Sequence, residues 1–240
     1  MNRVGHTLSG VAAGLWSLPI APVDGVAGSV AWVAAVTGFA LAPDLDHPGS
    51  TAARMWGPVT RLTARAVGAV VGHRGATHQV AAVGVVGAVV WLATSGRVAP
   101  AAAWLAAYLG IADPASVGAA AEHAALLAVV AVAVGLALAA LRVPALPNFG
   151  LSWLTAALAA RLDVPLVWLP WAAALGVAAH LAGDAITKRG LPGPAGRRVG
   201  LRVIRTGGPA ETLICCGLAL AIAAYPFRGH LAALIEGATT

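Results

Sequence analysis

Long apolar segments limit what this chain can fold into more than any other feature of its sequence. Several approach the ~20 residues that an α-helix needs to cross a bilayer, and none alternates polar and apolar residues as a barrel strand does. They are rich in Ala, Val, Leu and Gly, which suits helices packed through small residues. The seven segments cover residues 7–23, 26–42, 79–95, 98–112, 119–141, 165–184 and 210–227. The sequence therefore predicts an all-α fold, a polytopic transmembrane helical bundle with about six or seven membrane segments.

Composition supports a membrane protein and excludes an ordinary soluble domain. Hydrophobic residues make up 59% of the 240 residues and charged residues 10%, with a mean hydropathy of +0.83, whereas about a quarter of a soluble domain is charged. No linker or low-complexity tract divides the chain, so we expect a single integral-membrane domain over residues 1–240. The first segment is expected to be a retained helix, since it lacks a small-residue cleavage site. Residues 148–160 are apolar but short and are expected to form an interfacial or re-entrant helix.

Basic residues indicate how the chain is oriented. Lys and Arg accumulate in cytoplasmic loops, and most of the 15 basic residues lie in loops 43–78 and 185–209 or at Arg3. We therefore expect both loops to face the cytoplasm from a bacterial-type inner membrane. The net charge of +6 indicates contact with anionic lipid head groups, with no nucleic acid expected, although positive-inside topology alone explains the charge equally well. Residues 52–71 space three arginines among apolar residues, as in an amphipathic helix lying on the inner leaflet.

Ionisable residues cluster at the cytoplasmic ends of the predicted helices. A single boundary histidine or aspartate is more often a hydrogen-bonded residue or a helix cap than a metal ligand. Independent caps would not be expected to gather on one membrane face, so the joint pattern favours a metal site. The candidate metal ligands are His6, Asp44, Asp46, His47, His73, His78, His180 and Asp184.

Two short motifs contribute paired ligands. In "HLAGDAIT", His180 and Asp184 are four residues apart, which on a helix places them on one face about 5 to 6 Å apart. The histidines of "GHRGATHQ" cannot share a helix face in this way, because five residues rotate a side chain by about 140°. Its glycines instead predict a loop carrying His73, with Thr77 capping a helix whose first turn carries His78.

The motif "PDLDHP" holds three candidate ligands between Pro43 and Pro48, which disfavour helix and predict a stiff turn. Asp46 is the first choice among them for contact with a metal. Imidazoles and carboxylates together suit zinc, manganese or iron, whereas aspartates alone would suit magnesium. We expect a divalent transition metal, zinc in first place and manganese as the alternative. Eight candidate ligands exceed the four of a closed structural zinc site, which favours more than one ion.

Glu211 lies in "TGGPAETL", with Pro209 near the first position of the last predicted helix. A carboxylate in the first turn of a helix is stabilised by the helix dipole, which alone accounts for this residue. It also lies on the histidine side of the membrane, so a role as ligand or general base stays open.

Five motifs in this order resemble those of the YdjM family of predicted membrane-bound metal-dependent hydrolases. They are an N-terminal Gly-His pair, "PDLDHP", "GHRGATH", "HLAGDAIT" followed by a basic loop, and "TGGPAE" before a last apolar helix. The resemblance covers residues 1–96 and 165–227, and the helices within 97–164 are interpreted as an insertion. The family usually has Ser where this chain has Gln79, so no role is expected for a hydroxyl there.

The resemblance implies an activity as well as a fold. The family is distantly similar to the zinc-dependent phospholipase C and single-strand nuclease superfamily, which implies phosphoester hydrolysis by metal-activated water, with His180 and Asp184 as the best-matched ligands. Arg74 is then a candidate catalytic residue that clamps a phosphate oxygen, alongside Asp46 and Glu211. A site at the inner-leaflet boundary suits a phospholipid or another lipid-linked phosphoester as substrate.

Two other classes of function remain as alternatives. A metal-ion or small-solute transporter would place polar residues along helix midsections. The interiors of residues 79–95 and 124–141 contain no charged residue, which argues against a transporter. A scaffold with a structural metal is the other alternative, and the excess of candidate ligands argues against it.

Overall fold

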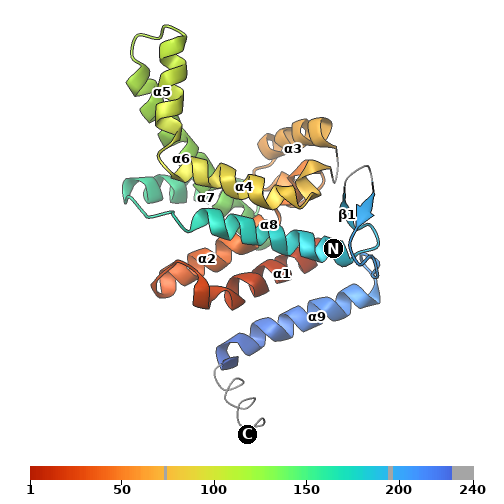
Figure 1. The fold of residues 1–240 in the computed structure, drawn as a ribbon. Helices are drawn as coiled ribbons and strands as arrows, with labels where there is room; N and C mark the ends of the chain where they lie inside the picture. Colours follow the sequence, from red (N-terminus) through yellow and green to blue (C-terminus); the bar gives the residue numbers. More distant parts are fainter. Residues whose placement is uncertain (73–74, 194–196, 229–240) are drawn as a thin grey trace.

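The computed structural model describes residues 1–72, 75–193 and 197–228 (Figure 1). These residues form nine α-helices, short 3₁₀ turns and one two-stranded sheet. The helices are α1 (Arg3–Trp16), α2 (Gly25–Phe39), α3 (Pro58–Val71), α4 (Ala81–Thr94), α5 (Val98–Tyr108), α6 (Pro114–Ala140), α7 (Ala145–Arg161), α8 (Leu169–Ile186) and α9 (Pro209–Ala224). The 3₁₀ turns are η1 (Leu18–Ile20), η2 (Ala42–Asp46), η3 (Ala52–Arg54), η4 (Ala76–His78) and η6 (Tyr225–Phe227).

Helix α2 is the centre of the bundle, and α1, α6 and α8 pack against it (Figure 1). Small residues allow these close contacts. A Cβ atom on Gly10 of α1 would lie 2.8 Å from the Cα of Thr37, and one on Gly176 of α8 would lie 2.5 Å from the carbonyl oxygen of Val36. Between these crossings, aliphatic and aromatic side chains such as Trp32 and Leu136 fill the apolar core. Close backbone approach through glycine is the ordinary way in which membrane helices associate.

In the described part of the chain, four helical stretches are long and apolar enough to cross a membrane: Gly25–Asp46, Pro114–Ala140, Leu169–Ile186 and Pro209–Phe227. Helices α4 and α5 qualify only as a pair, which is bent by 78°, and would make a fifth span. Helix α1 has 14 residues, a length of about 21 Å against a hydrocarbon core of about 30 Å. The multi-pass helical architecture is thus confirmed, whereas the count of six or seven membrane segments is not.

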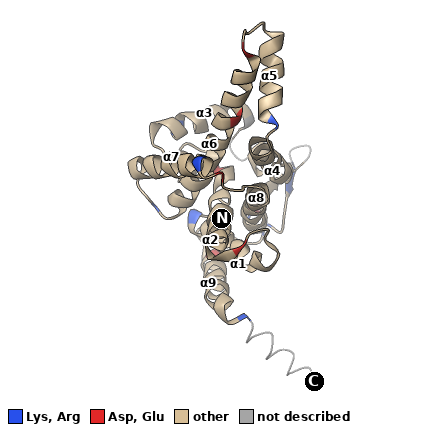
Figure 2. Cartoon of the chain, turned by 90° about the vertical axis from the view of Figure 1, so that its left-hand side faces the viewer, with Lys and Arg blue, Asp and Glu red and all other residues tan. Residues whose placement is uncertain are grey.

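Charged residues lie mainly in loops and at helix ends, and most helices are uncharged along their length (Figure 2). The predicted insertion forms α5, α6 and α7, and α5 with the first turns of α6 projects away from the rest of the molecule (Figure 1). The segment expected to be interfacial or re-entrant is a regular 17-residue helix, α7, which packs along α6.

Two segments differ from the predicted secondary structure. The basic loop after α8 contains an antiparallel pair, β1 (Leu191–Pro192) with β2 (Arg198–Val199), so the fold is not purely helical. Segment 52–71 is not one amphipathic helix, because Gly57 has a φ of 66° and separates η3 from α3. Only glycine adopts this conformation readily, and Pro58 then begins the new helix.

Candidate metal centre

Helix α8 supplies two buried side chains of the site. His180 and Asp184 are one turn apart on this helix, as the spacing predicted, and both are fully buried. The ring of His180 is held by a hydrogen bond of 2.8 Å between Nδ1 and the carbonyl oxygen of Ala40, at the end of α2. Because a carbonyl only accepts, Nδ1 carries the proton, and the lone pair of Nε2 faces the interior of the site.

His78 approaches from η4, and its neighbour Thr77 does not cap a helix as predicted. Helix α4 begins four residues after Thr77, at Ala81, with no side-chain cap. The Thr77 hydroxyl instead donates to Oδ2 of Asp46 at 2.6 Å. The prediction was wrong because the short 3₁₀ turn Ala76–His78 separates Thr77 from the helix, so its hydroxyl is out of position to accept a backbone N–H of α4.

The proton on His78 can be located from the same contacts. Its Nδ1 lies 3.0 Å from the Thr77 hydroxyl and 3.3 Å from Oδ2 of Asp46. Since the hydroxyl has given its hydrogen to Asp46, it accepts from His78, and Nδ1 is protonated. The Nε2 atom therefore presents a lone pair, as it does in His180, and the two Nε2 atoms are 3.3 Å apart. Two facing lone pairs at this distance repel each other unless a cation lies between them.

His6 from α1 completes this group. Its ring stacks on that of His180, with centroids 3.7 Å apart and planes 9° from parallel. Nε2 lies 3.1 Å from the carbonyl oxygen of Met1 and 3.5 Å from Oδ1 of Asp184. Within the part of the chain that the structure describes, Nδ1 of His6 is buried and has no hydrogen-bond partner. The amino group of Met1 forms an ion pair with Oδ1 of Asp184, so this carboxylate oxygen has a cationic neighbour.

The donor atoms form two overlapping groups that could hold metal. One group is His6, His180 and Asp184, and the other is Asp44, His78 and His180, with the donor atoms of each within 4.8 Å of one another. Oδ2 of Asp184 is 3.7 Å from Nε2 of His78 and 3.8 Å from Nε2 of His180. Two ligands bound tetrahedrally to zinc are about 3.3 to 3.5 Å apart, given bonds of about 2.0 to 2.1 Å. The donor types, their spacing and the opposed nitrogens therefore fit a divalent transition metal.

The remaining predicted site residues lie outside these two groups. Asp46 lies behind His78, on its Nδ1 side. His47 is exposed, and its Nδ1 accepts the backbone N–H of Gly49 at 3.1 Å. His73 and Arg74 lie outside the described residues.

Glu211 is buried at the start of α9, and Pro209 begins that helix as predicted. Its carboxylate accepts the backbone N–H of Asn2 at 2.6 Å and that of Gly207. In this position it connects the start of the chain to the loop before α9.

Asp44 is the exposed edge of the candidate metal centre. Its side chain is 25% exposed, whereas that of His78, 3.8 Å away, is 1% exposed. Asp44 also lines a cavity of about 290 Å³ together with His47, Arg3, Arg54 and Arg189. Through Asp44, the candidate metal centre therefore adjoins a cavity lined by basic side chains.

Sequence reasoning missed the residues that orient the imidazoles and those that surround the entrance. The Ala40 carbonyl has no sequence signal at all. The Thr77 hydroxyl does have one, since a Thr beside a candidate ligand is a common hydrogen-bonding neighbour. The position of Arg3 in the sequence indicates orientation in the membrane and does not predict that this residue lines the cavity beside Asp44.

Buried histidines and aspartates at one end of several apolar helices define an integral membrane protein with a candidate metal centre. Comparison with protein families agrees with this class: the model of the family described as YdjM inner membrane protein matches residues 1–235. The chain therefore belongs to the YdjM family, and it is a multi-pass protein of the inner membrane. Comparisons with curated proteins and with solved structures give no match.

Proposed function

We propose that this protein is a membrane-bound metal-dependent hydrolase that cleaves a phosphoester in a phospholipid or another lipid-linked substrate. The site would face the cytoplasm, at the boundary of a bundle with six or seven crossings. The observation that carries the proposal is the pair of Nε2 atoms of His78 and His180, 3.3 Å apart with both Nδ1 atoms donating elsewhere. With both Nδ1 atoms protonated, two neutral imidazoles have no hydrogen to share between their Nε2 atoms. A divalent cation bound by both Nε2 atoms would remove the repulsion between their lone pairs.

The proposed ligands divide into two sets around Asp184. Its Oδ1 faces His6 and its Oδ2 faces His78 and His180, so one carboxylate is positioned between both groups of donors. Asp184 would thus supply an oxygen to each group of donors, and we propose that the centre holds more than one ion. Nitrogen and carboxylate donors favour zinc, with manganese as the alternative. A bound divalent cation of this kind lowers the pKa of water and neutralises charge on a phosphoryl oxygen.

The chain's own residues then have separable roles. Asp46 and Thr77 fix the tautomer of His78, and the Ala40 carbonyl fixes that of His180, so both rings present acceptor nitrogens. Asp44 lines the cavity with a partly exposed side chain, so it is the group best placed to contact a substrate. Arg74 is proposed as a phosphate clamp on the basis of its place in "GHRGATH". Glu211 is proposed to act through the position of the N-terminal residues, because backbone N–H groups contact both of its oxygens.

A hydrolytic site is favoured over a conduit by where the buried ionisable side chains lie. In the described part of the chain they are His6, Asp46, His78, His180, Asp184 and Glu211. Contacts connect all of them to one another or to the N-terminal residues Met1 and Asn2. The cavities along the helices are lined almost entirely by apolar side chains. An ion pathway needs polar groups through the bilayer.

Metal analysis of the purified protein tests this function. Wild-type protein should carry a stoichiometric transition metal, His180→Ala should lose it, and Asn148→Ala, which removes a buried polar side chain elsewhere, should retain it. The metal-loaded wild type should hydrolyse bis(p-nitrophenyl) phosphate or phospholipid in mixed micelles, and Asp184→Asn should not. Wild-type protein without transition metal, or metal-loaded protein that cleaves no phosphodiester, would contradict the proposal.

A further inference from the structure

An arginine-lined entrance adjoins the candidate metal centre. The cavity that contains Asp44 adjoins a second one of about 410 Å³, because Arg3 and Arg54 line both. Arg142 lines the second cavity and Arg189 the first. The two cavities thus present four guanidinium groups and a single carboxylate, which already lies beside His78.

Three of these arginines lie close together without an acidic partner. In the described residues, no carboxylate forms a salt bridge with Arg3, Arg54 or Arg142. Partial burial lowers the pKa of Arg3, and the positive charges of Arg142 and Arg54 lower it further. Arg54 has a neutral contact, from Nε to the carbonyl oxygen of Ser50 at 3.2 Å. Unpaired guanidinium groups that repel each other form a site for a group with more than one anionic oxygen.

The backbone at Arg142 gives independent support. Helix α6 ends in the hydrogen-bond pattern in which Val143 N–H bonds the Leu138 carbonyl and Arg142 N–H bonds the Ala139 carbonyl. This helix ending normally places glycine in the left-handed conformation, and Gly110 does so after α5, with a φ of 73°. Arg142 adopts a φ of 63° there. Arg142 thus keeps a long cationic side chain at the cavity in a conformation that favours glycine, as Asp163 keeps a carboxylate in the same helix ending after α7, with a φ of 49°.

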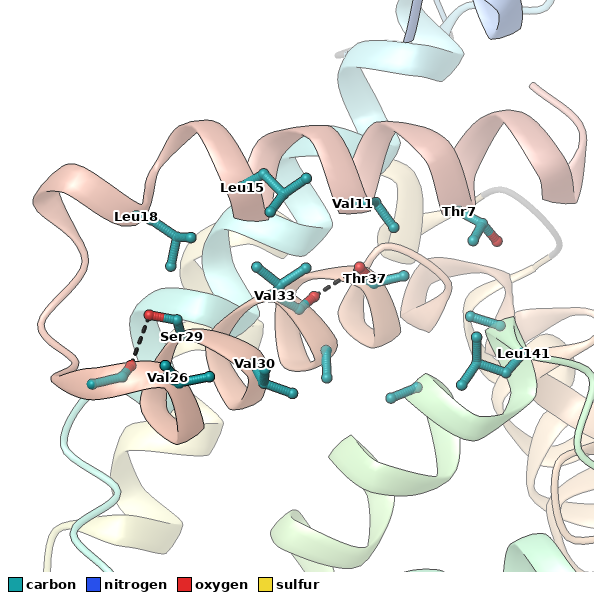
Figure 3. A pocket seen from close by; sticks show the side chains of 14 residues that line it. Thr7, Val11, Leu15, Leu18, Val26, Ser29, Val30, Val33, Thr37 and Leu141 are labelled. Atoms are coloured by element: carbon teal, nitrogen blue, oxygen red, sulfur yellow. Dashed lines mark hydrogen bonds between the residues drawn. The ribbon is translucent and has the colours of Figure 1, made fainter. Parts of the chain in front are cut away.

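An apolar groove begins where the arginines end. It has a volume of about 660 Å³ and lies between α1, α2 and the end of α6. Figure 3 shows Thr7, Val11, Leu15 and Leu18 along one wall, Val26, Val30, Val33 and Thr37 along the other, and Leu141 at one end. Thr7 is one helical turn after Arg3, and Leu141 directly precedes Arg142, so one end of the groove adjoins the arginines.

The groove offers a hydrocarbon chain an apolar surface over a suitable length. The hydroxyls of Ser29 and Thr37 donate to carbonyls of their own helix, at 2.8 and 2.7 Å, so they add little polarity to the wall (Figure 3). From Thr7 to Leu18 the groove follows about 17 Å of helix, roughly half of a bilayer's hydrocarbon core.

We propose that an anionic phospholipid binds here, with its phosphate among Arg3, Arg54 and Arg142 and one acyl chain in the groove between α1, α2 and α6. Charge complementarity accounts for the head group, and the continuity of groove and arginines accounts for a chain. The binding of this lipid is argued from the arginines and the groove alone. Its assignment as the substrate of the candidate metal centre rests on the proposed function. Arg3, Arg54 and Asp44 line one cavity, which adjoins the candidate metal centre at Asp44.

A binding experiment tests this on the intact protein without turnover. The probe is a non-hydrolysable phosphonate analogue of 1-oleoyl lysophosphatidic acid, titrated against the full chain in detergent and counted by native mass spectrometry. We expect one tightly bound molecule on wild type. Oleoyl lysophosphatidylcholine and inorganic phosphate should bind at least about tenfold more weakly, since each lacks part of the recognised chemistry.

Matched variants separate this site from general basic attraction. Arg142→Gly removes the guanidinium and suits the backbone, so binding should fall at least about tenfold with no loss of thermal stability. Arg205→Ala removes an exposed arginine that lines neither cavity and should bind as wild type. Val30→Trp should obstruct the groove, whereas Val85→Trp should not; the two valines are 63% and 60% exposed.

The proposal is overturned if Arg142→Gly binds like Arg205→Ala, or if Val30→Trp binds like Val85→Trp. If oleoyl lysophosphatidylcholine binds as tightly as the anionic phosphonate, the proposal is also overturned, because the arginines would then contribute nothing to the affinity. Failure of hydrolysis is a separate result: a protein that binds the phosphonate but cleaves no phosphoester retains the lipid site and loses the proposed activity.

Discussion

Two buried polar clusters can be compared within this molecule. One is the candidate metal centre of His6, Asp44, His78, His180 and Asp184. The other, the neutral cluster, consists of the Asn148 and Ser152 side chains on α7, the indole N–H of Trp56 and the Gly135 carbonyl on α6. Asn148, Ser152, His180 and Asp184 are all fully buried. Burial alone therefore does not distinguish the two clusters.

The balance of donors and acceptors does distinguish them. In the neutral cluster, Asn148 donates to the Gly135 carbonyl at 3.0 Å and accepts from Trp56 at 3.2 Å, while Ser152 donates to the Asn148 carbonyl at 2.7 Å. Every group has a complementary partner, and the cluster connects α6 to α7. In the metal centre, two acceptor nitrogens of His78 and His180 oppose each other. A mismatch of this kind, rather than buried polarity, is what indicates a ligand.

Removing metal should separate the clusters most strongly. Treating wild-type protein with 1,10-phenanthroline should lower its stability by about 4 kcal/mol, the contribution of a ligand present at about a thousand times its Kd. Asn148→Ala should lose a similar amount relative to its own untreated state, because its metal centre is intact. Thermal unfolding followed in detergent measures both losses. If the chelator does not change the stability of wild-type protein, the candidate metal centre holds no metal and is, like the neutral cluster, only a buried polar cluster.

Disrupting the neutral cluster should destabilise the fold without affecting metal. Asn148→Leu leaves the Trp56 indole N–H and the Gly135 carbonyl buried without their partner, which should cost about 3 kcal/mol. Denaturant unfolding gives the loss, and elemental analysis should give the wild-type metal content. A loss of metal in this variant would mean that the two clusters are coupled.

Asp46 tests how far orientation matters within the metal centre. Asp46→Asn removes the charge beside Nδ1 of His78 and should lower metal affinity about 10- to 100-fold, because the favoured tautomer is no longer fixed. Competition with a zinc-sensitive dye measures this change. If Asp46 were itself a required ligand, the variant would lose metal altogether, as His180→Ala does.

Glu211 should show the smallest effect. Glu211→Gln keeps one oxygen acceptor but loses charge-assisted bonds to backbone N–H groups, which should cost about 1 kcal/mol. Metal content should remain that of wild type if the residue acts through structure. A hydrolysis rate reduced at unchanged metal content and unchanged stability would instead support a general-base role.

The sequence predicted the helical membrane architecture well because long apolar runs have few alternatives. It also predicted that eight candidate ligands gather, since topology alone brings helix ends to one face, and five of them do: His6, Asp44, His78, His180 and Asp184. It did not predict which donors face inward. That depends on tertiary hydrogen bonds, such as that from His180 to Ala40, a residue 140 positions away. Thr77 was misassigned because helix capping and carboxylate binding use the same side chain.

The contact between α2 and α8 has a consequence for biogenesis. Gly176 fits against the Val36 carbonyl, and one turn later in each helix His180 meets Ala40. The ligands of α1 and η2 therefore emerge from the ribosome long before α8 completes their set. On the proposed function, the full set of metal ligands would exist only after α8 has inserted and docked against α2. Metal content would then report on the completed assembly of the bundle.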